Sequence, residues 1–344
     1  MYSSLDLLVQ KIKDAQSILL STHRQCDGDG LGAQLATYFA LRKSGKKVHC
    51  VNVDVAPKKY LFLQPDQHVK IYSGPDDSLP EEHFDLALVF DTNDARLVEP
   101  LYSHLIAQKT TVAFIDHHPP LKQGPLPTPE SWIDITCAST GEMAYQLLKA
   151  LNTPLDKDIA KALYTSVAFD TQIFRFIRNS PMSHRIAADL LQFDIQPDII
   201  HRNLFAQNTE KKMAFLGLVL SHIEYFGLGR VALLCLKTEE LATYDMDPDD
   251  SRDLIDLLMN IQKLQVAALF RQDGPDLFKM SLRSKSIDIL PLAEKFGGGG
   301  HHHAAGALVA MDYPNLRNEV VHFFEKALPG PGDGPTTGGS SQKS

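Results

Sequence analysis

The sequence has few cysteines and no long hydrophobic run. Its four cysteines (Cys26, Cys50, Cys137 and Cys235) are far apart and form no C-x-x-C pair. This spacing argues against a disulfide framework or a zinc knuckle and fits a reducing cytoplasm. No apolar stretch approaches the roughly 18–20 residues that a membrane-spanning helix needs. Residues 1–16 have a helical apolar spacing and lack the basic flank and apolar block of a signal peptide, so we expect a soluble chain.

An excess of positive charge is also missing. The 344 residues include 34 Lys and Arg against 42 Asp and Glu, which gives a formal net charge of −8. A protein that follows long nucleic-acid duplexes by neutralising many phosphates needs the opposite balance. Short nucleotides are compatible with this composition, because bound divalent metals reverse the local sign around clustered carboxylates.

The first half of the sequence alternates strand-like and helix-like segments. Apolar strands are predicted at 17–22, 47–53, 85–90 and 110–115. Helices are predicted at 31–44, 139–150, 157–168 and 181–193. Strands separated by helices favour an α/β fold with a mainly parallel sheet and helices on both of its faces.

The character of the chain changes after Phe193. Residues 194–208 are polar and predict a linker that leads into a long helix from about Thr209. Strand-like segments follow at 231–236, 266–272 and 278–284, and a helix is predicted at 251–261. We therefore expect two domains across a cleft, at 1–193 and 209–328, the second a smaller α/β domain. The tail at 329–344 has no large apolar side chain and is expected to be disordered.

The triplet Asp116-His117-His118 closes the apolar run at 110–115. A strand that ends in one carboxylate and two imidazoles brings metal-ligand groups to one point at the carboxyl edge of an α/β sheet. Two adjacent histidines are also common as surface residues. The weight of the triplet therefore depends on whether similar groups occupy other strand ends.

Three further positions carry such groups. His23 follows the first strand, and Asp27 and Asp29 come after it at H-x-x-x-D-x-D spacing. Asp91 ends the buried strand at 85–90, and Asp170 is a lone carboxylate in an apolar helical stretch. A carboxylate in apolar surroundings is costly unless a cation accompanies it.

Each of these positions has an ordinary alternative. Asp27 or Asp91 could be a helix N-cap, and Asp170 could form an ion pair with Arg175 or Arg178. A calcium EF-hand is a poor alternative for the first segment, because Leu31 stands where that loop has a ligand.

Taken together, the acidic and imidazole groups predict a two-metal site. A mixed Asp and His set suits Mn²⁺ or Mg²⁺ better than structural zinc. The set is large enough for two ions about 3.5–4 Å apart that share one carboxylate. Sites of that kind promote in-line attack on phosphorus.

These residues resemble the motifs of the DHH phosphoesterase family, which is named for the triplet found here at 116–118. The segment 23–29 resembles its first motif, Asp91 its second and Asp170 its fourth. The segments SLRSK (281–285) and FGGGGHHHAAG (296–306) are similar to the DHH-associated C-terminal domain. These motifs run in order from residue 23 to 306, and the arrangement is similar to the NrnA-type oligoribonuclease and pAp phosphatase subfamily.

The resemblance implies a role for each residue of the first domain. One Mn²⁺ would be held by His23, Asp27 and Asp91. The other would be held by Asp29, Asp91, His117 and Asp170, and Mg²⁺ or Co²⁺ are the alternative ions. Asp116 would orient His117 as a second-shell carboxylate. His118 would face the phosphate, where it stabilises charge or protonates the leaving oxygen.

Two positions depart from the family pattern. Cys26 stands where the family commonly has proline, and Ala33 stands where it commonly has serine. Cys26 is either oxidation-sensitive beside the metals or a small residue tolerated in a turn. Ala33 removes a hydroxyl and no metal ligand.

The glycine-rich segment 297–300 predicts substrate binding in the second domain. Successive glycine amides can form a nest for an anion, and His301 and Arg283 can add hydrogen bonds to phosphate. The expected substrate-binding residues are Arg283, Ser284, Lys285, Gly298, Gly299, Gly300 and His301. The alternatives are a histidine metal tract at 301–303 and a solvated strand edge at 283–285.

The sequence thus predicts a Mn²⁺-dependent phosphoesterase of the cytoplasm that acts on short oligoribonucleotides or linear dinucleotides and releases mononucleotides. Removal of the 3′-phosphate of pAp is a second expected activity. The alternatives are a cyclic dinucleotide phosphodiesterase, a polyphosphatase and a non-catalytic nucleotide-binding protein. We expect no long duplex and no membrane as a partner, and the resemblance makes a homodimer plausible.

Overall fold

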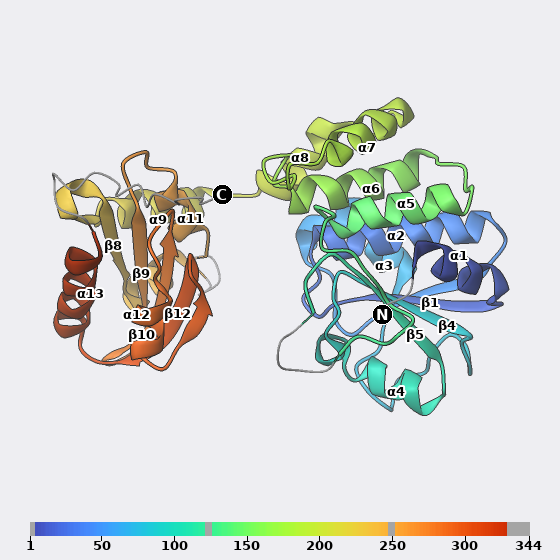
Figure 1. Ribbon diagram of the computed structural model, residues 1–344, viewed down its shortest axis with the longest axis horizontal. Helices are drawn as coiled ribbons and strands as arrows, with labels where there is room; N and C mark the ends of the chain where they lie inside the picture. Colours follow the sequence, from blue (N-terminus) through green and yellow to red (C-terminus); the bar gives the residue numbers. More distant parts are fainter. Residues whose placement is uncertain (1–3, 121–125, 247–251, 329–344) are drawn as a thin grey trace, which may run out of the picture. The chain divides into compact units, whose positions relative to one another are not determined.

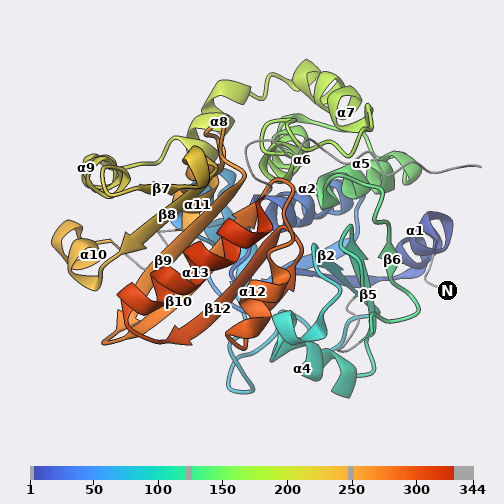
Figure 2. The same cartoon turned by 60° about the vertical axis from the view of Figure 1, so that its left-hand side comes forward.

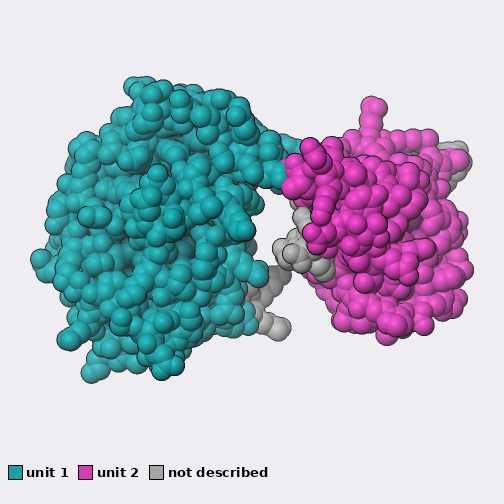
Figure 3. All heavy atoms as spheres, turned by 180° about the vertical axis from the view of Figure 1, so that it is seen from behind, with its two compact units in different colours: residues 1–207 teal, residues 208–344 magenta. Residues whose placement is uncertain are grey.

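The computed structural model describes residues 4–120, 126–246 and 252–328. The chain forms two compact units, Met1–Gln207 and Asn208–Ser344 (Figure 3). The expected disorder at 329–344 concerns residues outside the described part of the chain.

The first unit is built on a six-stranded sheet in which all neighbouring strands are parallel. The strands are β1 (Ser17–Thr22), β2 (Lys47–Asn52), β3 (Val69–Ile71), β4 (Leu86–Phe90), β5 (Thr111–Asp116) and β6 (Trp132–Ile133). Their order is β3-β2-β1-β4-β5-β6, so the winding direction reverses between β1 and β4. The carboxyl ends of strands beside such a reversal are where open α/β sheets bind ligands.

Helices cover both faces of this sheet. They are α1 (Leu5–Asp14), α2 (Gly28–Lys43), α3 (Pro65–His68), α4 (Leu101–Ala107), α5 (Thr140–Ala150), α6 (Lys157–Asp170), α7 (Met182–Leu190) and α8 (Pro197–Phe205), with 3₁₀ turns η1 (Lys58–Leu63), η2 (Ala95–Val98) and η3 (Leu191–Phe193). Figure 1 shows α2, α5 and α6 on one face and α4 on the other. Separate apolar cores fill the two faces, as alternate side chains of each strand point to opposite sides.

The second unit contains a mixed six-stranded sheet of order β11-β12-β10-β9-β8-β7, in which only the β8–β9 pair is parallel among the described strands. The strands are β7 (Glu224–Phe226), β8 (Val231–Leu236), β9 (Val266–Gly274), β10 (Leu277–Ser284), β11 (Gly299–His301) and β12 (Ala304–Ala310). The helices are α9 (Glu210–Leu220), α10 (Thr238–Tyr244), α11 (Arg252–Met259), α12 (Leu290–Lys295) and α13 (Tyr313–Ala327), with a 3₁₀ turn η4 (Gly227–Gly229). Helices α12 and α13 pack on one face, as Figure 2 shows, and α9, α10 and α11 pack on the other.

The predicted α/β class, with a parallel sheet and helices on both faces, is confirmed. The short strands β3 and β6 were not predicted, because two or three residues are too few to show a strand period. Helix α2 begins at Gly28 and not near residue 31, because Asp27 caps it by accepting hydrogen bonds from the amides of Asp29 and Gly30.

The segment 194–208, expected to be a linker, contains helix α8. Ile200 and Leu204 on this helix are buried in the core of the first unit. Ile200 and Leu204 are four residues apart, a helical spacing, but most of their neighbours are polar. The prediction relied on that polarity and missed the helix. Within the described ranges 4–120, 126–246 and 252–328, no helix is long and apolar enough to cross a membrane.

Candidate metal centre

The sequence-predicted ligands gather at the carboxyl edge of the parallel sheet. In the register of β1 and β4, Thr22 lies opposite Phe90, so His23 and Asp91 leave the sheet side by side. In the register of β4 and β5, Phe90 lies opposite Ile115, which brings Asp116 to the same edge. Parallel pairing therefore converges residues that are far apart in the sequence.

His23, Asp27 and Asp91 form one group of potential ligands, whose atoms lie within 4.8 Å of one another. The His23 Nε2 atom is 3.8 Å from an Asp27 carboxylate oxygen and 3.5 Å from Asp91 Oδ2. His23 Nδ1 is 2.9 Å from the carbonyl oxygen of Arg24, which can only accept a hydrogen bond. Without a cation, burial is outweighed by the carboxylates of Asp27 and Asp91, which raise the pKa of His23 to about 11. Loss of the Nε2 proton would leave the remaining proton on Nδ1 and a lone pair on Nε2, as a metal ligand requires.

Asp29, His117 and Asp170 form a second group with the same 4.8 Å limit. His117 Nε2 lies 3.6 Å from Asp29 Oδ2 and 3.5 Å from Asp170 Oδ2. This nitrogen is buried and has no hydrogen-bond partner. An orphaned imidazole nitrogen that faces carboxylates is a poor arrangement for a protein alone and a good one around a cation.

Asp91 lies between the two groups. Its Oδ2 atom faces His23, and its Oδ1 atom is 3.6 Å from His117 Nε2. Thr140 donates a hydrogen bond to Oδ1 at 3.0 Å. The residue has a φ of +63°, a strained left-handed conformation for an aspartate that is typical of functional sites. The Asp91 carboxylate thus belongs to the first group and also lies beside His117 of the second.

Three carboxylates of this cluster, those of Asp29, Asp91 and Asp170, resist ionisation in the absence of a cation. Burial raises the pKa of Asp91 to about 7 and that of Asp170 to about 6. Burial and the charges of Asp91 and Asp170 raise the pKa of Asp29 as well. Burial also lowers the pKa of His117 to about 4, so its ring is neutral at pH 7. The residues present thus fit divalent metals, which would stabilise the ionised carboxylates and the neutral imidazole.

Asp29 is held rigidly from the N-terminal end of α5. Its carboxylate accepts hydrogen bonds from the amides of Thr140 at 2.8 Å and Gly141 at 3.0 Å and from the Ser166 hydroxyl. The sequence analysis missed Thr140 and Ser166. The sequence Ser-x-x-Glu at 139–142 marks this helix start, where the Ser139 hydroxyl accepts from the amide of Glu142, and it could have pointed to the free amides of the first turn.

His118 is oriented by Asp116, which is a correction to the role expected for that carboxylate. Asp116 Oδ1 is 2.8 Å from His118 Nδ1, whereas His117 Nδ1 lies 3.3 Å from the carbonyl oxygen of Cys137. Asn93, another residue that the sequence analysis missed, donates to Asp116 Oδ2 at 2.6 Å. Asp116 therefore fixes the adjacent histidine, because His117 has turned toward the ligand cluster.

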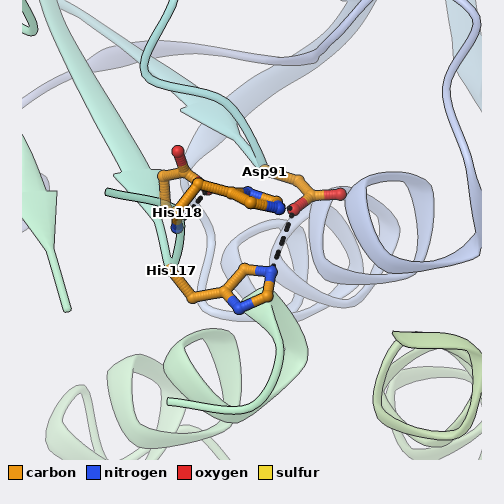
Figure 4. A group of neighbouring side chains, drawn as sticks. Asp91, His117 and His118 are labelled. Atoms are coloured by element: carbon orange, nitrogen blue, oxygen red, sulfur yellow. Dashed lines mark hydrogen bonds and ion pairs between the residues drawn. The ribbon is translucent and has the colours of Figure 1, made fainter. Parts of the chain in front are cut away.

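Figure 4 shows both imidazoles turned toward the carboxylate of Asp91. The side chain of His118 is 54% exposed, whereas that of His117 is 2% exposed. The hydrogen bond with Asp116 raises the pKa of His118 to about 9. His118 is therefore a protonated, accessible donor beside a buried metal-ligand set.

Two ordinary alternatives can now be judged. Asp27 does cap α2, and its carboxylate still lies in the first ligand group, so the cap and the site coexist. In the described part of the chain, neither Arg175 nor Arg178 is within ion-pair distance of Asp170, so the expected ion-pair alternative is wrong.

Cys26 is buried next to the first ligand group. Burial and the charge of Asp54 raise the pKa of its thiol to about 12. A buried, protonated thiol is unreactive, which favours the tolerated small residue over the oxidation-sensitive one.

The substrate-binding residues expected in the second unit lie on β10 and β11 and in the turns beside them. Arg283 is half-buried and is 3.6 Å from Asp256. His301 on the edge strand β11 is exposed. Ser284 and Lys285 already have partners within the unit: Ser284 Oγ accepts from the amide of Ile287, and Lys285 Nζ donates to the carbonyl of Ile261.

The glycines of this segment serve the strand pairing. A Cβ atom at Gly298 would lie 2.1 Å from the Gly306 carbonyl oxygen, and one at Gly300 would lie 2.5 Å from that of Ala304. Gly299 has open space beside it. Close packing on β12 therefore explains Gly298 and Gly300, whereas a Cβ atom at Gly297 or Gly299 would meet nothing within 4 Å.

Comparison with known proteins assigns both units to families. The chain matches the DHH family N-terminal domain over residues 17–167 and the DHHA1 domain over residues 231–328. It is 27% identical over 331 residues to the bifunctional oligoribonuclease and PAP phosphatase NrnA of Thermus thermophilus, with 95% of each chain covered. It is 25% identical over 327 residues to the probable bifunctional oligoribonuclease and PAP phosphatase NrnA of Streptococcus mutans, with 93% of this chain and 97% of the relative covered.

A solved structure shares the fold over nearly the whole chain. It is described as an exopolyphosphatase-related protein from Bacteroides fragilis, and it superposes with a TM-score of 0.81 at 23% sequence identity. The match covers 94% of this chain and 95% of the other. At this identity the likeness concerns the fold and not the substrate.

Proposed function

Since the chain belongs to the DHH family of metal-dependent phosphoesterases, with a DHHA1 domain as its second unit, we propose that it hydrolyses short oligoribonucleotides or linear dinucleotides to mononucleotides with two Mn²⁺ ions. Removal of the 3′-phosphate of pAp to give AMP is part of the proposal. The names of the nearly full-length relatives support this substrate class.

The observation that carries the proposal is the pair of ligand groups that meet at Asp91. One group offers His23 and Asp27, and the other offers Asp29, His117 and Asp170. Oxygen-rich sets with one imidazole each suit Mn²⁺. When bound, the ions would supply an activated water and neutralise charge on the phosphate.

The residues of the chain have distinct tasks in this proposal. We assign His118 to donate to the phosphate or to the leaving oxygen, because its ring is accessible beside the ligand groups and the hydrogen bond with Asp116 raises its pKa. Asp116 holds that ring in place, and Asn93 holds Asp116. In the second unit we assign Arg283, Gly299 and His301 to one end of the substrate, which would favour short chains.

A substrate panel tests the proposal. The purified protein, stripped of metal and reloaded with Mn²⁺, Mg²⁺ or Co²⁺, is given pApA, RNA of about two to five nucleotides, RNA of about twenty nucleotides, pAp, cyclic di-AMP and pyrophosphate. We expect the fastest turnover with Mn²⁺ and the shortest linear RNAs, and measurable release of phosphate from pAp.

Other outcomes of the panel would redirect the assignment. Preference for pyrophosphate or for the longest RNA contradicts the proposal. Preference for cyclic di-AMP supports the alternative of a cyclic dinucleotide phosphodiesterase. The Asp91→Ala variant is the negative control, and full activity in that variant would place the chemistry elsewhere. A homodimer and a cytoplasmic location stay predictions, which light scattering and cell fractionation would check.

A further inference from the structure

Arg178 lies beside the metal-ligand cluster and has no role in the function proposed above. It belongs to the loop between α6 and α7, and its backbone has a left-handed φ of +50°. Its guanidinium donates to the carbonyl oxygen of Ile135, and its Nη2 atom is 3.3 Å from His117 Nδ1. Its positive charge partly offsets the rise in the pKa of Asp170 and adds to the burial that lowers the pKa of His117.

The contact with His117 cannot persist when that histidine binds a metal. A guanidinium is always a donor, so Nδ1 must accept, and the ring proton then sits on Nε2, which faces three carboxylates. A metal on Nε2 requires the other tautomer, in which Nδ1–H donates to the Cys137 carbonyl oxygen 3.3 Å away. Metal binding and the Arg178 contact are therefore mutually exclusive.

Without the His117 contact, the guanidinium has one hydrogen-bond partner among the residues that the structure describes, the backbone carbonyl of Ile135. The residue is exposed, and among the described residues no carboxylate lies within ion-pair distance of it. A planar cation with unused donors at the edge of a phosphoesterase centre matches the oxygens of a phosphate. Arg175, three residues earlier, differs because its guanidinium lies over the Phe176 ring at 5.0 Å.

We propose that Arg178 binds the phosphoryl group of the substrate in the metal-loaded enzyme, where His117 would be a metal ligand and its contact with the guanidinium would be lost. The proposal rests on the proposed function for the identity of the substrate. The ligand chemistry that it predicts, an accessible phosphate group, does not depend on the proposed function. Loss of the His117 contact would in this way leave the guanidinium of Arg178 available to the phosphate.

The test measures binding rather than turnover. Calorimetry with inorganic phosphate and with AMP, on Mn²⁺-loaded protein, compares the wild type with Arg178→Gln and Arg178→Lys. We expect the dissociation constant for phosphate to rise about tenfold in Arg178→Gln and less in Arg178→Lys, as loss of a charge-assisted hydrogen bond predicts. Mn²⁺ affinity should stay the same or increase, because a competitor for His117 has been removed.

Arg185→Gln, which removes the same charge from an exposed position on α7, is the matched control and should leave both affinities unchanged. Thermal unfolding checks that each variant is folded. If Arg178→Gln does not fold, phosphate binding is compared between the wild type and Arg178→Lys alone. Unchanged phosphate binding in both variants would overturn the proposal. Weakened Mn²⁺ binding would also overturn it, since Arg178 would then support His117. If the substrates of the panel are not hydrolysed but the Arg178 variants still bind phosphate more weakly, only the proposed function is refuted.

Discussion

At the scale of single residues, the two adjacent histidines have opposite environments. His117 is buried with a neutral ring, and its Nε2 atom faces carboxylates, whereas His118 is half-exposed and hydrogen-bonded to Asp116. Both rings face Asp91, but His117 lies among the buried carboxylates, whereas Asp116 holds the ring of His118 at the solvent-exposed edge of the cluster. Two identical residues thereby acquire different chemistry.

Removal of the His118 ring should separate catalysis from metal binding. We expect His118→Ala to lower kcat on pApA by about 10²–10⁴-fold, the usual effect of losing a general acid. Mn²⁺ affinity, measured by calorimetry, should stay within about twofold of the wild type. His83→Ala, at an exposed position before β4, is the control. Loss of metal binding in His118→Ala would instead make His118 a ligand.

The raised carboxyl pKa values predict a pH dependence of metal binding. Asp91, with a pKa of about 7, and Asp170, with a pKa of about 6, are protonated below those values in the metal-free protein. A metal binds their ionised forms, so Mn²⁺ affinity should fall as pH drops through 7 and 6, and binding should release protons. Calorimetry in two buffers of different ionisation enthalpy counts those protons. A constant affinity between about pH 5.5 and 8 would contradict the prediction.

At the scale of elements, the close contact of α2 and α6 positions the second ligand group. Asp29 lies in the first turn of α2, and Asp170 is the last residue of α6. The helices approach closely at Gly32, where a Cβ atom would lie 2.6 Å from the carbonyl oxygen of Ala162. The spacing of two metal ligands therefore depends on a glycine that carries no ligand.

Gly32→Ala should disturb both stability and metal binding. Overpacking of this kind costs about 1–3 kcal/mol, and here it would also push α6 away from α2. We expect a lower free energy of unfolding in urea and weaker Mn²⁺ binding. Gly217→Ala on α9, where a Cβ atom meets nothing within 4 Å, is the matched variant and should stabilise by about 0.5–1 kcal/mol. Equal effects of the two substitutions on the free energy of unfolding would show that helix propensity, and not packing against α6, determines the effect of Gly32→Ala.

At the scale of the whole molecule, metal ligands and the expected substrate-end residues belong to different units. All the residues of the ligand groups lie in the first unit, and Arg283, Gly299 and His301 lie in the second. Each unit has its own sheet and apolar cores. The proposed function therefore predicts that variants of the second unit alter substrate affinity and spare metal binding.

Arg283→Gln tests this division of roles. We expect its KM for pApA to rise about tenfold or more, because a charge-assisted hydrogen bond to phosphate is lost. Mn²⁺ affinity and hydrolysis of bis-(p-nitrophenyl) phosphate, which has no nucleotide end to bind, should be unchanged. Lys326→Gln, in the last turn of α13, is the control for charge. An unaltered KM would remove Arg283 from the substrate site.

The sequence by itself determined where the strands of the first unit end and which polar groups follow them. His23, Asp91 and Asp116 could be placed at strand ends because an apolar run that stops at a polar residue is a local signal. Parallel pairing then requires those ends to meet. The α/β class and the candidate ligands followed from that reasoning, whereas the short strands and helix α8 did not.

Only the tertiary structure decided which ligand group or hydrogen-bond partner each of these polar side chains has. Asp27 and Asp29 are two residues apart, but the start of α2 at Gly28 directs them into different ligand groups. Asp116 holds His118 and not His117, and the amide of Thr140, 111 residues along the chain, holds Asp29. Such contacts depend on helix starts and on packing between distant segments, and no local pattern encodes them.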